Sequence, residues 1–213
     1  MTKTVDNDLK FILLGGFFLI ALLIYTGLHA YDFLTWCMEV APVIIALPIL
    51  AATYRTFPLT SLLYWVILLH SIVLIFGGMY TYARVPLGFE IAQWLNLTRN
   101  PYDKIGHFMQ GFAPALIARE ILIRGNYING RRMLNFIVIC IVLAISASYE
   151  LIEWGAAVWM GQGADEFLGT QGDIWDTQSD MFFALIGSSV AIGFLSGFHD
   201  KLIKKVGQNE NSR

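Results

Sequence analysis

The stretch from Ala164 to Asp180 holds five carboxylates and no lysine or arginine, in a chain in which only 14% of residues are charged. Within it, Asp173, Asp176 and Asp180 are three and then four residues apart, so in a helix they would share one face. Like charges placed in this way repel one another and do not stabilise a helix. The spacing therefore indicates that this segment binds a cation.

Two earlier segments carry titratable pairs at similar spacing. Asp103 and His107 are four residues apart and Glu150 and Glu153 are three apart, so each pair would lie on one helical face. Imidazole together with carboxylate suits zinc, manganese or iron, whereas carboxylates alone would suit magnesium or calcium. We expect one divalent metal ion, whose identity the residues leave open. The expected ligands are Asp103, His107, Asp173, Asp176 and Asp180.

Three further residues would carry the chemistry if this site is catalytic. A bound metal ion polarises a phosphoryl or acyl oxygen, or activates a water molecule. Glu150 or Glu153 would then act as general base, since a carboxylate beside the reacting group can accept its proton. Lys104 would hold an anionic headgroup. We expect membrane lipids and a lipid or lipid-linked substrate as partners, and no nucleic acid.

The elements that must position these residues are membrane helices. With 56% hydrophobic residues and a mean hydropathy of +0.60, the chain is not a soluble domain, and a helix needs roughly 18 or more apolar residues to cross a bilayer. We expect a single all-α domain over residues 1–213, a polytopic bundle of about six transmembrane helices. The expected spans are Phe11–Leu28, Val40–Thr53, Leu59–Tyr80, Asp103–Ile123, Met133–Met160 and Met181–Phe198, with an interfacial helix over Phe89–Leu97.

The distribution of lysine and arginine predicts the orientation of the bundle. If the N-terminus is inside, ten of these residues lie on the inner side, and only Arg84, Arg99 and Lys104 lie on the outer side. Positive residues accumulate on the cytoplasmic side of membrane proteins. We therefore expect both termini in the cytoplasm, a multi-pass protein of the bacterial inner membrane, and an acidic site that faces the periplasm. This topology would bring the candidate residues to one depth, in the outer third of the membrane.

Several motifs carry a resemblance to known families. The segment Pro101–Phe108 resembles the DKxxHF opening of VanZ-like membrane domains, and Tyr149–Leu151, Gly172–Asp176 and Gly187 resemble the second half of that superfamily. This likeness covers about residues 102–193. Over nearly its full length the chain resembles the YjdF-type family of bacterial inner-membrane proteins, a domain of unknown function. The GTQGDxWDTQxDM segment of that family matches Gly169–Met181 without a gap.

The resemblance implies little about activity. VanZ-like proteins are associated with glycopeptide resistance and the cell envelope, and the YjdF-type family implies no assigned reaction. This chain departs from the VanZ-like pattern at Asp180, where that family more often has Asn, and in the additional Glu153. Both departures add negative charge, which favours a metal ion.

Two function classes therefore stay open. One is a metal-dependent membrane enzyme; the other is a non-enzymatic protein for cation binding, transport or envelope stress. Transporters place their ion sites near the bilayer midplane, whereas these charges lie toward one face. Structural alternatives also stay open: Asp173 could cap a helix, Glu150 and Glu153 could form a solvated face, and His70 could be a hydrogen-bonded core residue. Glu120 and Arg124, four residues apart, are expected to form an ordinary surface pair.

Overall fold

The computed structural model describes residues 2–161 and 171–210, and within these ranges it contains helices and no strands. Asp165 and Glu166, two of the five carboxylates noted above, lie outside the described residues. In the described part of the chain, five helical segments are long and apolar enough to cross a membrane. The helices are α1 (Thr2–Leu28), α2 (Phe33–Thr53), α3 (Ser61–Met79), α4 (Pro86–Leu95), α5 (Tyr102–Arg124), α6 (Arg131–Met160), α8 (Asp176–Val190), the π-helix η1 (Ala191–Leu195) and α9 (Ser196–Glu210).

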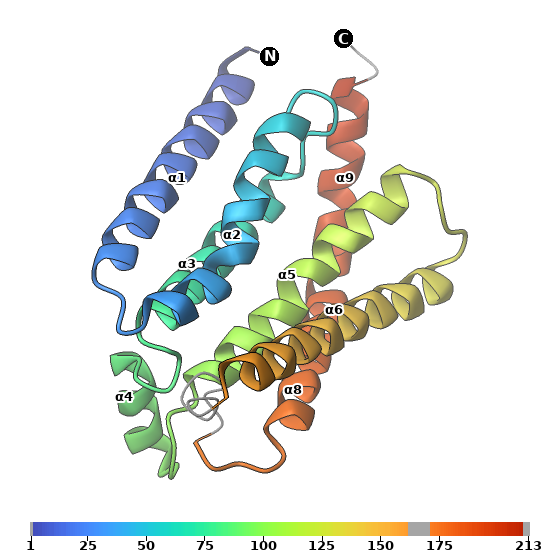
Figure 1. Cartoon of the computed structure of the whole chain (residues 1–213). Helices are drawn as coiled ribbons and strands as arrows, with labels where there is room; N and C mark the ends of the chain where they lie inside the picture. The colour runs from blue at the N-terminus through green and yellow to red at the C-terminus, as the bar shows by residue number, and fades with distance from the viewer. Residues whose placement is uncertain (1, 162–170, 211–213) are drawn as a thin grey trace.

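The expected class, an all-α membrane bundle, is confirmed. The five apolar segments are joined by α5, which has the length of a span and crosses the middle of the bundle (Figure 1). The segments α8, η1 and α9 follow one another without a break in the last long helix. The start of α1 and the end of α9 lie at one end of the bundle, opposite α4 (Figure 1). We call the end of the bundle that holds α4 the α4 end, and the end that holds the start of α1 and the end of α9 the opposite end.

The helix α2 differs from the expectation at its beginning. It starts at Phe33 rather than Val40, because the Asp32 carboxylate accepts a hydrogen bond from the Thr35 backbone N–H at 2.7 Å and caps the helix. This hydrogen bond also holds the pKa of Asp32 below its ordinary value. The earlier start makes Glu39 part of the apolar helix, where it is buried.

The short helix α4 is displaced from its expected range, Phe89–Leu97. It begins at Pro86, because proline at the first helical position has a fixed φ and needs no hydrogen bond for its nitrogen. It ends where Asn96 adopts a left-handed conformation with φ of 53°. Phe89 and Trp94 are exposed on its surface, as expected for an interfacial helix.

The central contact of the bundle joins α5 to α8, and glycines permit its closeness. A Cβ atom at Gly111 would meet the carbonyl group of Ala184, and one at Gly187 would meet the carbonyl group of Phe108. Small residues allow two membrane helices to approach in this way. The close approach brings the first turns of α5 and α8 together, where the candidate site lies.

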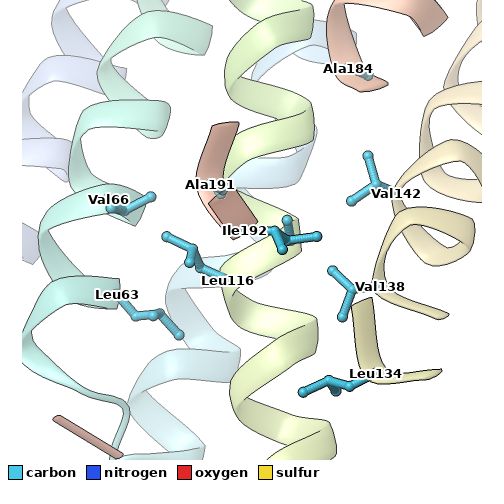
Figure 2. Close-up of a cluster of buried hydrophobic side chains, with 11 residues drawn as sticks. Leu63, Val66, Leu116, Leu134, Val138, Val142, Ala184, Ala191 and Ile192 are labelled. Carbon is cyan, nitrogen blue, oxygen red and sulfur yellow. The ribbon is translucent and has the colours of Figure 1, made fainter. Parts of the chain in front are cut away.

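A buried apolar cluster fills the bundle between α3, α5, α6, α8 and η1 (Figure 2). Leu116 from α5 lies in it with Val138 and Val142 from α6, and all three are fully buried. Many large apolar side chains outside this cluster are exposed, as lipid-facing side chains of a membrane bundle must be. Cys140 of α6 is also exposed.

Candidate metal and carboxylate site

Lys104 lies at the centre of the carboxylate cluster on the α4 end. Its Nζ donates to Asp176 Oδ1 at 2.8 Å and to Asp180 Oδ1 at 2.5 Å, and it lies 3.4 Å from Asp103 Oδ2. All three partners are carboxylates, so the ammonium group compensates part of their negative charge. In this structure Lys104 is thus a counter-ion within the cluster, and its expected contact with a headgroup stays a prediction.

His107 lies one turn below Asp103 on the same face of α5. Its Nε2 is 3.3 Å from Asp103 Oδ1 and 3.8 Å from Asp180 Oδ1, while its Nδ1 is 3.1 Å from Gln110 Oε1. The amide oxygen only accepts hydrogen bonds, so Nδ1 carries the hydrogen. Nε2 faces the two carboxylates, so a protonated imidazole can donate to Asp103, and on loss of that proton the Nε2 lone pair would point where a metal ligand needs it.

Asp103, His107 and Asp180 form a geometrically possible metal site. One ligand atom from each residue lies within 4.8 Å of the others, and His107 and Asp180 are only 6% and 2% exposed. A metal ion with ligand bonds of about 2 Å fits between atoms at such separations. The site therefore combines one imidazole with two carboxylates, contributed by the two most closely packed helices.

Asp173 and Asp176 are held by a different cation, Arg99. Its guanidinium lies 2.7 Å from Asp173 Oδ2 and 3.1 Å from Asp176 Oδ1. Since α8 begins at Asp176, the expected common helical face includes Asp176 and Asp180 but not Asp173. Asp173 Oδ1 instead accepts a hydrogen bond from the Trp175 backbone N–H in the turn before the helix. Asp173 therefore closes the turn before the helix and does not cap α8, whose N-cap residue Trp175 makes no side-chain capping hydrogen bond.

The segment before α8 is also attached to the loop before α5. The Gln171 side-chain amide forms two hydrogen bonds with the backbone of Asn100, each 3.0 Å long. This pairing matches an amide side chain to a peptide group, donor to acceptor and acceptor to donor. It keeps Arg99 next to Asp173 and Asp176.

Glu150 reaches the site from α6. Its Oε1 lies 3.9 Å from His107 Nδ1 and has no hydrogen-bond partner among the described residues. With a side chain only 8% exposed, Glu150 does not belong to a solvated face. A buried acceptor without a partner is costly and usually has a functional reason.

A polar cavity of about 130 Å³ adjoins the metal-ligand group. Its wall includes Glu39, Tyr82, Asp103, His107, Tyr149 and Glu153. Glu153, which the sequence analysis expected at the site, is one of these wall residues. Glu39 is a site residue that the sequence analysis missed, and Tyr149 Oη donates to its Oε2 at 3.4 Å. A single carboxylate within an apolar span was the signal that could have identified it.

Tyr82 occupies a strained position beside this cavity. Thr81 and Tyr82 have φ angles of 51° and 49°, which lie in the left-handed region. The Tyr82 ring lies against Gly77 and Gly106, where an added Cβ would collide with it. Burial raises the pKa of Tyr82 well above its ordinary value, so the phenol stays protonated. Strain of this kind is concentrated at functional sites.

A second polar cluster lies toward the opposite end, and it corrects the expected surface pair. Glu120 is 0% exposed. Its carboxylate accepts hydrogen bonds from Thr60 N and Arg124 at 3.0 Å, from Thr60 Oγ1 at 2.8 Å and from His199 Nε2 at 2.9 Å. Arg119 pairs with Asp200 at 2.5 Å. The cluster connects α9 to α5 and to the start of α3, because distant segments supply every partner except Arg124.

The α4-end site carries more negative than positive charge. Among the described residues, its carboxylates outnumber its two permanent cations, Lys104 and Arg99. Carboxylates in such proximity cannot all stay ionised without further positive charge. The structure thus brings together Asp103, His107, Asp176, Asp180, Glu150 and Lys104, with Glu153 lining the adjacent cavity and Asp173 held outside by Arg99.

Comparisons with known proteins agree with this membrane architecture. Residues 11–201 match the family described as "Predicted membrane protein (DUF2238)". The chain is 62% identical over 186 residues to "Inner membrane protein YjdF" of Escherichia coli (strain K12), an alignment that covers 87% of this chain and 89% of the relative. No solved structure matches the chain, and the likeness to VanZ-like domains stays a prediction. This chain therefore belongs to the DUF2238 family, and its relative and its apolar helices identify it as a multi-pass protein of the bacterial inner membrane.

Proposed function

We propose that this chain is a membrane enzyme that binds one divalent metal ion through Asp103, His107 and Asp180 and acts on a lipid or lipid-linked substrate. The observation that carries the proposal is the convergence of these three ligand atoms within 4.8 Å. An acidic cluster alone would be weaker support. Here a buried imidazole points its Nε2 at two carboxylates, and Gln110 supports that tautomer from the other side.

The charge of the site supports a bound metal ion. Lys104 and Arg99 already pair with Asp103, Asp173, Asp176 and Asp180, which leaves Glu39, Glu150 and Glu153 without a permanent cation in the contacts described above. A divalent ion would compensate part of this excess. The mixed nitrogen and oxygen ligands favour zinc, manganese or iron. Such an ion would supply Lewis acidity toward a phosphoryl or acyl oxygen, or toward water.

Glu150 is the general base of the proposed enzyme. Its Oε1 is buried, lies 3.9 Å from the His107 ring and has no hydrogen-bond donor among the described residues, so it can accept a proton from a reacting group near the ion. Glu153 lines the adjacent cavity and is the second candidate for this role. Lys104 positions Asp176 and Asp180 through its ammonium group.

The orientation of the site is part of the proposal. The excess of lysine and arginine on the side of the termini supports a cytoplasmic location for that side. The α4 end would then face the periplasm, and a substrate would reach the site from the outer leaflet.

A transport function has weaker support. Between Gln110 and Arg119, α5 contributes Ala113, Ala115 and Leu116 to a fully buried apolar layer. This layer, shown in Figure 2, lies between the α4-end site and the Glu120 cluster. An ion that crossed the membrane along α5 would have to pass it without polar contacts, at a high desolvation cost.

The decisive experiment measures bound metal. The protein is purified in mild detergent, and its divalent metals are determined by elemental analysis for the parent, His107→Ala, Asp180→Asn and the control His29→Ala. His29 follows the last residue of α1, bonds to the Tyr25 carbonyl, and belongs neither to the metal-ligand group nor to the cavity wall. We expect near-stoichiometric metal in the parent and the control, and loss in both site variants. A folded parent without metal would overturn the proposal.

A further inference from the structure

A second, larger cavity opens beside the polar one and is almost entirely apolar. Its volume is about 570 Å³. The walls come from four helices, with Met38, Ala46 and Leu50 of α2, Ile67 of α3, Ile117 of α5 and Ile152 of α6. We call this cavity the α2–α6 groove. In a membrane protein such a groove is solvated by hydrocarbon, not by water.

The groove and the polar cavity are adjacent and share part of their walls. Glu39, His70, Pro114, Tyr149 and Glu153 line both of them. A molecule that fills the two spaces together must therefore have a polar part near Asp103 and His107 and a hydrocarbon part along α2. This is the chemistry of a membrane amphiphile.

The two side walls of the groove, α2 and α6, pack against different helices and not mainly against each other. This leaves the groove open toward the bilayer between them. The helix α2 packs mainly on α3, whereas α6 packs on α5 and α8. Across the groove, Tyr149 Oη of α6 donates to Glu39 Oε2 of α2 at 3.4 Å, at the level of the polar cavity. Beyond that level Ile45 and Ile49 of α2 line the groove and are themselves exposed. A chain from the bilayer can enter there without leaving its apolar surroundings.

The length of the groove restricts the kind of chain. It follows α2 from Met38 to Leu50, about 18 Å at a rise of 1.5 Å per residue. A bilayer core is about 30 Å thick, so one leaflet is about 15 Å deep. The groove begins more than a turn inside α2 and ends near its last turn. An occupant that fills it would extend past the bilayer middle, which the paired acyl chains of one leaflet do not do.

We infer that the substrate of this site, given the proposed enzyme, is an amphiphile with one long hydrocarbon chain that lies along α2 in the α2–α6 groove. Its reacting group lies in the polar cavity, whose volume of about 130 Å³ holds a small group. Glu39, Asp103 and Glu153 line that cavity, and they repel an anionic group unless the metal ion is present. A neutral polar group is not repelled by these carboxylates and can occupy the cavity without the metal ion.

The test measures binding of a radiolabelled long-chain polyprenol, its monophosphate and a two-chain phosphatidylglycerol to the purified protein. Ala46→Phe places a ring in the groove, and Ala52→Phe makes the same change on the same helix at an exposed position outside it. We expect Ala46→Phe to weaken polyprenol binding by about tenfold or more. Ala52→Phe is expected to bind like the parent, and metal content is expected to be unchanged in both variants.

A photoreactive polyprenol gives a reading that does not depend on any variant. Cross-links to the parent are expected in α2 between Met38 and Leu50 and in α6 near Ile152. Equal polyprenol binding by the parent and Ala46→Phe, cross-links confined to other helices, or tighter binding of phosphatidylglycerol would overturn the inference. A folded parent that binds polyprenol but contains no metal would refute the proposed enzyme and leave the groove assignment intact. Binding of the polyprenol monophosphate that is lost in His107→Ala would support both the proposed enzyme and the groove assignment.

Discussion

At the scale of single residues, the site depends on the direction in which His107 presents its lone pair. Gln110 holds Nδ1 at 3.1 Å, and this leaves Nε2 facing Asp103 and Asp180. The partner of the other ring nitrogen fixes the tautomer and orientation of a metal-binding histidine. Gln110 is therefore a positioning residue for the proposed metal ion.

Replacing Gln110 with Leu is expected to weaken metal binding by about 10- to 100-fold, because the imidazole loses the acceptor that fixes its tautomer. The measurement is a titration of the metal-free protein against a competing chelator. Gln93→Leu on the exposed surface of α4 is the matched control and is expected to bind like the parent. Equal affinities for parent and Gln110→Leu would mean that Gln110 does not orient the ring.

Sequence reasoning found the carboxylates, the histidine and the lysine that gather near one end of the expected spans, and it missed Arg99 and Glu39. The spacing of Asp103 and His107 predicted a shared face, and they lie 3.3 Å apart. Neither Arg99 nor Glu39 stands at helical spacing from another site residue, and each meets the site only through the packing of separate segments. Asp173 was assigned to the helical face because the sequence does not mark Asp176 as the first residue of α8.

At the scale of helices, the close contact of α5 with α8 determines whether the ligands meet. Gly187→Ala would push a methyl group against the Phe108 carbonyl. We expect a loss of about 1–3 kcal/mol of stability and weaker metal binding, because Asp180 moves away from His107. Thermal unfolding in detergent and metal titration measure the two effects.

Gly193→Ala is the control for this contact, since a Cβ there meets no atom within 4 Å. An alanine within a helix is otherwise favourable by roughly 0.5–1 kcal/mol over glycine. Gly193→Ala should thus be as stable as the parent or slightly more so. If both variants behave alike, the glycine at position 187 is not needed for the approach of the helices.

The Glu120 cluster has a structural role at the same scale. Glu120→Ala leaves Thr60, Arg124 and His199 without their common acceptor in a fully buried place. Breaking a buried charged network typically costs about 3–5 kcal/mol. We expect a matching fall in thermal stability with unchanged metal content in the surviving folded protein. Glu90→Ala on the exposed side of α4 should leave both unchanged.

At the scale of the whole molecule, the sequence predicted the class and the most polar span, expected over Asp103–Ile123 and observed as α5 (Tyr102–Arg124), but it did not place the buried glutamates. The apolar spans were identified because each needs only composition and length. The start of α2 was placed at Val40 rather than Phe33, which left Glu39 outside the expected span, although burial in the bundle accommodates it. Glu120 was assigned to the surface because only its partner Arg124 is visible from helical spacing. Its other partners, Thr60 and His199, come from distant parts of the chain.

The orientation of the whole bundle determines which leaflet supplies the substrate, and it can be tested directly. In a background with Cys37→Ala and Cys140→Ala, single cysteines are introduced as Asn96→Cys at the α4 end and Gln208→Cys near the end of α9. The excess of lysine and arginine near the termini predicts that Gln208 lies in the cytoplasm. A membrane-impermeant maleimide should then label Asn96→Cys in cells with a permeabilised outer membrane, and Gln208→Cys only after lysis. The reverse pattern would place the carboxylates at the cytoplasmic surface, so that a substrate would have to come from the inner leaflet, even if the metal site itself is retained.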